Sequence, residues 1–496
     1  MTLNDVLSGL LTSGGDDRLR VDARTGRNRY QCAPRPLPGE ISLCSSTAST
    51  ISAEAFAQLG PAWSALQAGI VAYGAAHAYQ RAVDDIRDDL RDIYALGDTD
   101  IVVAASGTDL HLLAASLLAS AHGGRLTTLT LPGNESGSGV IHAAAGHHFT
   151  PAPPYGAPAP LGAPVCLGSR IRNVTFRARD DAGRMRPDDE IEQELAGRIT
   201  EAQAAGEHCL LVVADVSKTG AIIPSLETVQ RLRLRFAGTL DVLIDACQMR
   251  LSAATLRAYL AQNLLVAITG SKFYAGPVFS AALLVPPAPS RRLAGASLPP
   301  ELSAYSLRAD WPAHWQAGRA LMPGVNFGLV LRWRAALCAM RTFAAVPEPV
   351  THHTIAALGR AVSQGLAASP VFAPAAVPSP DRSALHADGG FDRLPTIFPF
   401  YLANAQGHHA TAADVRAIYD ALATGSASPA VRLGQPVAMA GDADALRLCL
   451  SAPLIVRASR SEAALQAAIA DIHLALDRVA GLATARLWSG PRRAAG

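Results

Sequence analysis

Residues 241–281 read DVLIDACQMRLSAATLRAYLAQNLLVAITGSKFYAGPVFSA. Two short apolar runs, at 241–246 and 264–270, flank an amphipathic stretch at 251–262. This order predicts a strand, a helix and a second strand, because short continuous apolar runs are typical of strands buried on both faces. The stretch therefore predicts two neighbouring strands of a parallel sheet.

Polar side chains follow both predicted strands. Asp245 ends the first run and Gln248 comes three residues later, while Ser271 and Lys272 follow the second run. The carboxyl ends of parallel strands meet at one edge of an open sheet, and ligands bind outside that edge. We therefore expect these four side chains to lie together in a ligand site.

Lysine is rare in this chain. The 43 basic residues include only two lysines, Lys218 and Lys272. Arginine stays protonated in proteins, whereas a buried lysine amine can lose its proton and act as a nucleophile. A position that stays lysine can therefore mark chemistry, although a composition bias with two accidental survivors explains the count equally well.

The spacing of these residues resembles a known family. Asp-x-x-Gln, then one helix, then Thr-Gly-Ser-Lys and Gly-Pro resemble the core of the fold-type-I pyridoxal-phosphate enzymes, especially class V aminotransferases and cysteine desulfurases. The resemblance implies that Asp245 faces the pyridine nitrogen, Gln248 faces the phenolic oxygen and Lys272 forms a Schiff base. It also implies that Thr269 and Ser271 bind the phosphate. A carboxylate and an amine at adjacent strand ends suit this cofactor, since one keeps the ring nitrogen protonated and the other attaches it.

Lys218 is the rival for the covalent role. It lies in Ser-Lys-Thr-Gly after an apolar run, but it precedes Asp245 and has no Gly-Pro after it. In relatives, a polar residue at this place lies near the phenolic oxygen or the substrate. We expect Lys272, rather than Lys218, to bind the cofactor covalently.

A second stretch predicts a phosphate site. An apolar strand at 101–105 runs into Ser106, Gly107 and Thr108, and a helical pattern follows. A helix N-terminus offers free N–H groups and positive partial charge, so it can hold a phosphate. The alternative is an ordinary helix cap by Thr108 or Asp109. The strand-Ser-Gly-Thr-helix order resembles the phosphate loop of the same enzymes, which favours phosphate.

The resemblance also suggests a substrate contact near the C-terminus. An Arg-x-x-x-Ser strand binds the substrate α-carboxylate in relatives, and this pattern maps to Arg447 and Ser451. The guanidinium suits a carboxylate through its bidentate geometry. The alternative is a surface arginine on an edge strand, in which case the carboxylate contact would lie among N-terminal arginines such as Arg27 or Arg29.

No ring-stacking residue is evident. Ser136 stands where class V desulfurases have a histidine, and His142, His147 and His148 are nearby. A lone histidine is more often structural, and adjacent histidines point in different directions. We expect no metal site.

The composition is that of a globular protein: 496 residues, 49% hydrophobic, 17% charged and a formal net charge of +2. No basic patch or acidic tail indicates a nucleic-acid partner. No apolar run is long enough to span a membrane, and no signal region follows Met1. Seven cysteines, far apart and without Cys-x-x-Cys pairs, favour a reduced cytoplasm.

We predict an α/β fold, with a mostly parallel sheet sandwiched by helices and a smaller α+β C-terminal domain. The expected domains are an irregular N-terminal segment at 1–60 that can contribute to the active site, a large cofactor-binding domain at 61–290, a connector at 291–330 and a small domain at 331–496. A long helical pattern covers 54–96. By analogy with the family, we expect a homodimer acting on a small amino-acid substrate.

The leading hypothesis for the reaction is transamination. Desulfurases need a cysteine on a mobile loop, but 346–446 contains none, Cys449 lies in the predicted Arg447 strand and Cys338 lies in a helical pattern. The alternatives are a pyridoxal-phosphate lyase or β/γ-substitution enzyme of specialised metabolism, and a binding or regulatory protein that has kept the fold without turnover. The intact Lys272 and Asp245 argue against the last of these.

Overall fold

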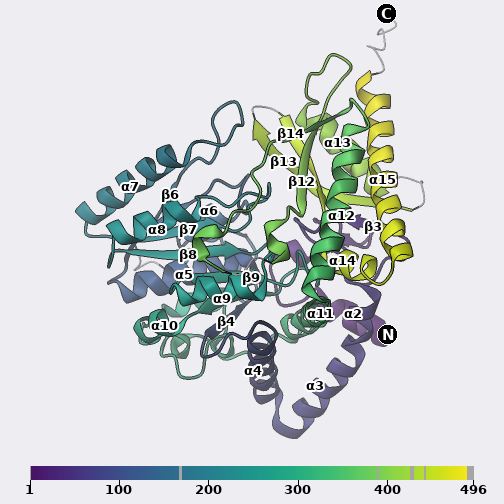
Figure 1. Ribbon diagram of the computed structural model, residues 1–496. Helices are drawn as coiled ribbons and strands as arrows, with labels where there is room; N and C mark the ends of the chain where they lie inside the picture. The colour runs from purple at the N-terminus through teal and green to yellow at the C-terminus, as the bar shows by residue number, and fades with distance from the viewer. Residues whose placement is uncertain (1, 167–169, 388–389, 425–428, 441–442, 489–496) are drawn as a thin grey trace, which may run out of the picture.

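The computed structural model of the chain shows two large β-sheets side by side, each covered by helices (Figure 1). A short hairpin of β1 (Val21–Asp22) and β2 (Arg27–Asn28) lies near the N-terminus. The structure describes residues 2–166, 170–387, 390–424, 429–440 and 443–488.

The larger sheet has seven strands, and β10 alone runs antiparallel to the others. The strands, in spatial order, are β4 (Asp100–Ala104), β10 (Ala281–Val285), β9 (Leu265–Thr269), β8 (Leu240–Ala246), β7 (His208–Ala214), β5 (Arg125–Thr130) and β6 (Arg170–Thr175). The predicted mostly parallel sheet is confirmed, and β8 and β9 are adjacent strands as the stretch at 241–281 predicts.

Helices cover both faces of this sheet. Along β4, Ile101 and Val103 belong to one apolar core and Val102 to the other, because successive side chains of a strand point to opposite faces. The first core is closed by α7 (Asp188–Ala204), α8 (Leu226–Arg235) and α9 (Ala253–Ala261), and the second by α5 (Gly107–Ala121) and α10 (Pro287–Leu293).

The smaller sheet has five strands, in the order β11 (Phe372–Pro374), β12 (Ile397–Leu402), β14 (Ala443–Cys449), β13 (Val431–Ala440) and β3 (Ile41–Leu43). Its neighbours are antiparallel except for β3, which pairs parallel with β13. It packs with α12 (Glu348–Ala367) and α13 (Ala412–Thr424), and α14 (Ala452–Ala458) and α15 (Glu462–Ala483) pack in turn on α12. The predicted smaller α+β unit is therefore present, and the N-terminal segment supplies its edge strand.

The N-terminal segment is more ordered than the irregular stretch that we predicted. It contains α1 (Leu3–Leu11) as well as β3. Its loop is held by Arg332 of α11 (Phe327–Ala344), which is buried and donates to the carbonyl oxygens of Phe279 (2.6 Å), Leu11 (3.2 Å), Ser13 (2.5 Å) and Gly14 (3.1 Å). A guanidinium can donate to several buried carbonyl oxygens at once, so the Arg332 side chain alone fixes three carbonyl groups of the N-terminal segment.

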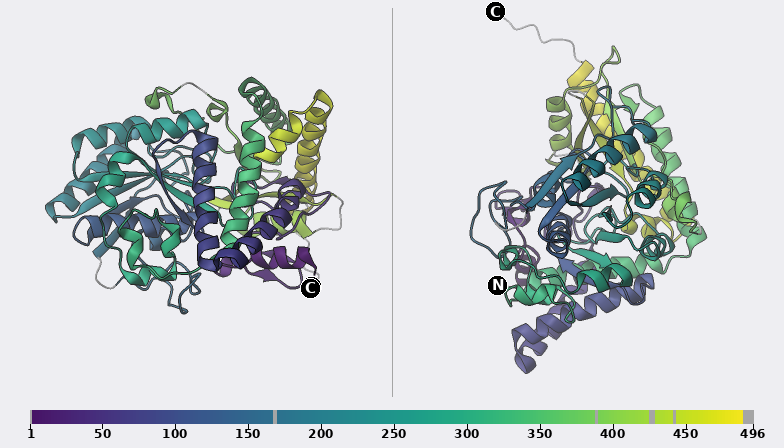
Figure 2. Two further views of the ribbon diagram at one scale, coloured as in Figure 1. Left: turned by 90° about the horizontal axis from the view of Figure 1, so that it is seen from below. Right: turned by 90° about the vertical axis from the view of Figure 1, so that its left-hand side faces the viewer.

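The helical pattern at 54–96 forms three helices rather than one: α2 (Ala53–Ala57), α3 (Leu59–Tyr73) and α4 (Ala75–Tyr94). The break between α3 and α4 is at Gly74, whose φ of 84° is in the region that favours glycine. The end of the hairpin where α3 meets α4 projects from the body of the molecule (Figure 2), while one face of α4, including Tyr79, Val83 and Ile86, is buried. Although α3 is largely apolar, only Leu59 and Leu66 of it are buried, and Val71 is 88% exposed. Among the described helices, none combines the length and apolarity that crossing a membrane requires.

Candidate active site

A pocket lies at the carboxyl-terminal edge of the larger sheet, where loops that follow β4, β8 and β9 meet the N-terminal segment and the strands β13 and β14. Eight of the nine side chains predicted for the site line it: Ser106, Gly107, Thr108, Asp245, Thr269, Ser271, Lys272 and Arg447. These residues come from positions more than 300 residues apart in the sequence. Those that follow β4, β8 and β9 meet because the carboxyl ends of parallel strands lie at one edge of the sheet.

Asp245 is the last residue but one of β8, and 15% of its side chain is exposed. Its Oδ2 atom lies 3.1 Å from Nε2 of His111, and its Oδ1 atom accepts the backbone N–H of Cys247 at 3.1 Å. Burial alone would raise the pKa of this carboxyl group. The hydrogen bond to His111, the charges of His111 and Lys272, and the Cys247 N–H outweigh burial, so the pKa is well below its usual value. Asp245 is therefore a stable anion.

His111 was missed by sequence reasoning. It lies on α5, one turn after the predicted phosphate loop, and its side chain is 1% exposed. The only signal in the sequence is a single histidine within an otherwise apolar helix, which more often marks a structural residue. Its role follows only from the contact with Asp245, 134 residues away.

Lys272 follows β9 and is half-buried in the pocket. Among the described residues, no hydrogen-bond or ion-pair partner holds its amine. The turn that carries it packs closely on α11, since a Cβ atom added to Gly270 would lie 2.3 Å from the Cβ of Ala336. A glycine is needed there for close approach of the loop, which fixes the backbone before Lys272.

The predicted phosphate loop forms the N-terminus of α5. Ser106 is its N-cap and makes a capping box with Asp109, so the cap is neither Thr108 nor Asp109 as the alternative proposed. A Cβ atom added to Gly107 would lie 2.7 Å from the Sγ atom of Cys247, which shows how closely this turn approaches β8. Gly107 and Thr108 of this first turn line the pocket, and the N–H groups of a first helical turn have no partner within the helix.

Arg18, another residue that sequence reasoning missed, lies against this helix N-terminus. Its Nη1 atom is 3.2 Å from Oγ1 of Thr108, and its Nη2 atom is 3.0 Å from Oγ of Ser106. Asp16 holds the same guanidinium at 2.6 Å, and the ring centroid of Phe279 is 4.6 Å from it. No local motif marks Arg18, because its partners are about 90 residues away in the chain.

Arg447 lies on β14 and lines the same pocket as the first residues of α5. Its Nε atom donates to the Gln435 carbonyl at 3.0 Å, its Nη1 atom to the Lys218 carbonyl at 3.0 Å, and its Nη2 atom to Oγ1 of Thr47 at 3.0 Å. All of these acceptors are neutral. Burial lowers the pKa of Arg447 from its ordinary value, and among the described residues no carboxylate forms an ion pair with it.

Of the two N-terminal arginines named as alternatives to Arg447, only Arg29 lines the pocket. Arg27 forms an ion pair with Glu40 at 3.0 Å. Lys218 also lines the pocket, so both lysines of the chain face the same cavity. The location of both lysines in one pocket favours a functional role over a chance effect of composition.

Gln248 is the predicted site residue that does not line the pocket. It is 3% exposed, and its Nε2 atom donates to the carbonyl oxygen of Ser46 at 3.0 Å. The amide therefore supports the N-terminal segment, which supplies Ser46 to the pocket wall. The N-terminal segment therefore lies next to the loop that follows β8. The Asp-x-x-Gln spacing does not predict this contact.

The residues that line the pocket near the expected ring-stacking position have small side chains and include no aromatic ring. Ser136 donates to the Leu131 and Pro132 carbonyls and lies outside the lining. The lining at this place is the run Gly137, Ser138, Gly139 and Val140. His142, His147 and His148 lie outside it, and Nδ1 of His148 is 2.8 Å from the Tyr305 hydroxyl.

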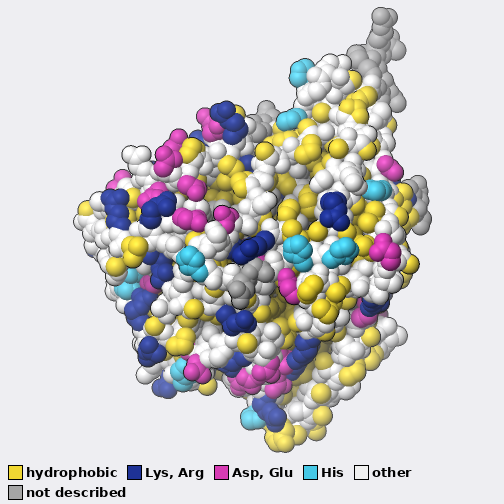
Figure 3. All heavy atoms as spheres, viewed as in Figure 1, with side chains coloured by type: hydrophobic (Ala, Val, Ile, Leu, Met, Phe, Trp, Pro, Cys, Tyr) yellow, Lys and Arg dark blue, Asp and Glu magenta, His cyan; other side chains and the backbone are white. Residues whose placement is uncertain are grey.

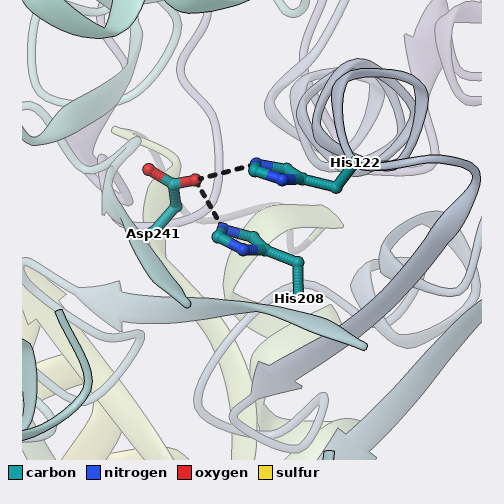
Figure 4. A group of neighbouring side chains, drawn as sticks. All are labelled: His122, His208 and Asp241. Atoms are coloured by element: carbon teal, nitrogen blue, oxygen red, sulfur yellow. Dashed lines mark hydrogen bonds and ion pairs between the residues drawn. The ribbon is translucent and has the colours of Figure 1, made fainter. Parts of the chain in front are cut away.

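A second polar cluster lies at the opposite, amino-terminal edge of the larger sheet (Figure 4). His122 and His208 stack at 3.6 Å with an interplanar angle of 7°, and Nε2 of His208 is 2.8 Å from Oδ2 of Asp241. Arg292 donates to Nε2 of His122 and to Asp241, both at 3.0 Å. Two parallel stacked imidazoles cannot both direct their in-plane lone pairs at one ion about 2.1 Å away. The cluster is therefore a satisfied hydrogen-bond network.

Comparisons with known proteins bear on the fold. No protein-family model matches the chain, and no curated protein matches it in sequence. Solved structures do match. A NifS-like protein has a TM-score of 0.54 at 12% identity, over 88% of this chain and 99% of its own. A complex of the cystine C–S lyase C-DES with its reaction product cysteine persulfide has a TM-score of 0.52 at 16% identity, over 86% of this chain and 97% of its own.

A second C-DES structure, a variant with glycine covalently linked to the PLP cofactor, has a TM-score of 0.50 at 15% identity, over 86% of this chain and 96% of its own. At such low identity these similarities concern the fold. They extend over nearly the whole length of each solved chain, so both sheets are included. The chain therefore has the fold of the fold-type-I pyridoxal-phosphate enzymes.

Proposed function

We propose that the chain is a pyridoxal-phosphate enzyme that acts on an α-amino acid through Lys272. One observation carries the proposal. A single pocket holds the anionic carboxylate of Asp245 and the unpartnered amine of Lys272 at the ends of two adjacent parallel strands. The relation to solved structures supports it, since one of them contains this cofactor.

The residues present fit the cofactor. Its phosphate would bind at the N-terminus of α5, through Ser106, Gly107 and Thr108, with Arg18 as a cationic partner. The close approach of Gly107 to Cys247 brings this anion site next to the Asp245 strand, where a side chain would otherwise fill the gap. Thr269 and Ser271, which line the same region, would complete the phosphate contacts. Gln248 is not needed for this assignment.

When bound, the cofactor supplies an electron sink for the bond that breaks at the substrate Cα. Asp245 would keep the ring nitrogen protonated, and His111, 3.1 Å away, would keep Asp245 in place. Lys272 would be the covalent anchor, and its free amine would hold or move the proton at the substrate Cα. Arg447 binds the substrate α-carboxylate, because its charge has no acidic partner among the described residues and it faces the same pocket.

Aminotransfer is the reaction we propose. A desulfurase is disfavoured because six of the seven cysteines are buried, Cys338 is a helix residue and Cys247 is a packed residue beside Asp245 with a strongly raised pKa due to burial. Such a thiol is a poor nucleophile. A lyase is the second candidate, since C-DES, a cystine C–S lyase, is among the similar folds.

We also propose a homodimer in the cytoplasm. The apolar helix α3 leaves Val71 and Tyr73 exposed at 88% and 63%, and exposed apolar faces of this kind mark association surfaces. We propose that the partner is a second copy of this chain, by analogy with the family that the sequence resembles. All seven cysteines are free thiols, which fits a reducing compartment.

Borohydride reduction of the loaded protein followed by peptide mapping should tag Lys272, because its amine is the unpartnered one beside Asp245. The variant Lys218→Ala should still be tagged at Lys272, and Lys272→Ala should lose the tag. A tag on Lys218 would overturn the assignment of Lys272.

Arg18→Met should weaken binding of pyridoxal phosphate and spare binding of pyridoxal, which lacks the phosphate. A charge-assisted contact is worth about 1.5–3 kcal/mol, or roughly 10- to 150-fold in the dissociation constant. Equilibrium titration by absorbance measures both ligands, and Arg24→Met, an exposed change in the same segment, is the matched control. An equal loss for both ligands would show that Arg18 only supports the fold.

The type of reaction can be read from the cofactor that is recovered after one turnover. In an aminotransferase, adding a reactive amino acid without an oxo-acid acceptor should leave pyridoxamine phosphate and a stoichiometric oxo acid, since the nitrogen stays on the cofactor. A lyase returns pyridoxal phosphate and releases ammonia or a side-chain fragment. Chromatography of the denatured protein with mass detection of products distinguishes them, and recovery of pyridoxal phosphate alone with catalytic product would favour the lyase.

A further inference from the structure

The charge of the pocket is strongly one-sided. Its lining has five basic residues and one acidic residue: Arg18, Arg29, Lys218, Lys272 and Arg447 against Asp245. The chain as a whole is almost balanced, with 43 basic and 41 acidic residues. On the face shown in Figure 3, side chains of both signs are interspersed. Because Asp16 pairs with Arg18 at 2.6 Å, the local excess of positive charge comes from the other four cations of the pocket.

The proposed function, on which this inference rests, accounts for three of the five cations. Lys272 anchors the cofactor, Arg18 faces its phosphate and Arg447 faces the α-carboxylate of the substrate. Lys218 and Arg29 remain without an assigned anion.

These two residues flank Arg447. On one side, the Nη1 atom of Arg447 donates to the carbonyl oxygen of Lys218 at 3.0 Å. On the other side, Gln435 accepts from Arg447 through its carbonyl oxygen at 3.0 Å and donates through Nε2 to the carbonyl oxygen of Arg29 at 3.4 Å. The main chain of Lys218 and of Arg29 is therefore tied to Arg447, directly or through Gln435, and all three side chains line the pocket. The charge of Arg447 also acts on the Lys218 amine.

No described carboxylate forms an ion pair with Lys218, Arg29 or Arg447. The Nζ atom of Lys218 donates to the carbonyl oxygen of Gly133 at 2.7 Å, which leaves two of its three donors for other partners. Glu135 is the acidic residue whose charge acts on Lys218.

Glu135 is nevertheless committed elsewhere. It accepts from Arg179 at 2.7 Å and from the hydroxyl groups of Ser217 and Thr219 at 2.7 Å each. Arg447 is buried, Lys218 is half-buried and Arg29 is exposed. Two cations that are close together and partly removed from water, as Arg447 and Lys218 are, destabilise one another unless an anion lies between them.

We propose that the substrate is an amino acid with an anionic side chain, a carboxylate, sulfonate or phosphate, which Lys218 and Arg29 bind beside Arg447. The α-carboxylate and the side-chain anion would then occupy neighbouring parts of one cationic wall. This arrangement selects acidic amino acids over their neutral isosteres, because a neutral side chain would leave two cations without a partner.

The decisive experiment compares acids with their amides on the loaded enzyme. Apparent dissociation constants are measured from the change in cofactor absorbance with aspartate against asparagine and glutamate against glutamine. Cysteate and phosphoserine test the other two anions. We expect the best acid to bind roughly 10- to 150-fold more tightly than its neutral isostere.

Variants locate the effect. Lys218→Met should bring the acid to within a few-fold of the amide while changing the amide little, and Lys218→Arg, which keeps the charge, should retain most of the preference. Arg29→Met should reduce it, and Arg24→Met, an exposed arginine of the same segment, should not. Equal constants for acid and amide in the unaltered enzyme overturn the inference, as does a Lys218→Met change that weakens all amino acids alike. A protein that holds no cofactor on Lys272 overturns the proposed function itself, which the absorbance shows before any amino acid is added.

The chain also offers a direct readout of Lys218. Burial, then the charges of Arg447 and Lys272, lower the pKa of Lys218 from 10.5 to about 7, against an opposing effect of Glu135. A bound side-chain anion favours the protonated amine and must raise this pKa. Below its pKa the amine is protonated and does not react with acylating reagents.

Trace acetylation across a pH series, followed by peptide mapping, should therefore give a midpoint for Lys218 near 7 without ligand. Because the chain has only two lysines, the peptide is assigned without ambiguity. We expect the midpoint to move upward with saturating aspartate or another preferred acid and to stay in place with the matching amide. An identical midpoint with acid and amide would contradict the contact between Lys218 and the side-chain anion.

Discussion

The largely desolvated carboxylate of Asp245 is the constraint on which the site depends. A charge removed from water must be matched by hydrogen bonds and opposite charge, or the group takes up a proton instead. Here the match comes from His111 on α5, from the Cys247 N–H and from Lys272 after β9. Three elements must therefore keep their relative positions for Asp245 to stay ionised, and they are the same elements that carry the proposed phosphate site and covalent anchor.

Much of this arrangement could be predicted from the sequence, because it follows from local patterns. Apolar runs identify β8 and β9, and parallel strands bring Asp245 and Lys272 to one edge. The strand and glycine before Thr108 likewise identify the start of α5. In each case the deciding residues lie within a few positions of the element that carries them, so periodicity and turn chemistry contain the necessary information.

The rest depends on contacts between distant parts of the chain. Arg18 meets α5 across about 90 residues, and Gln248 turns to Ser46 across 202 residues. Neither contact has a pattern in the sequence, since both depend on how the N-terminal segment crosses the molecule. The long helical pattern also broke into separate helices, where a single glycine at position 74 outweighed the propensity of its neighbours.

The parallel pairing of β3 with β13 has a consequence for how the protein is made. Ile41 is opposite Val431 and Leu43 is opposite Leu433, so one strand of this pair leaves the ribosome long before the other. Domains tend to fold from the N-terminus during synthesis, and the larger sheet is complete once β10 has emerged. The strand β3 therefore has no partner until β13 has been synthesised. The pocket wall that contains Thr47 and Arg447 can therefore close only at the end of translation, and an incomplete chain has no substrate end to its site.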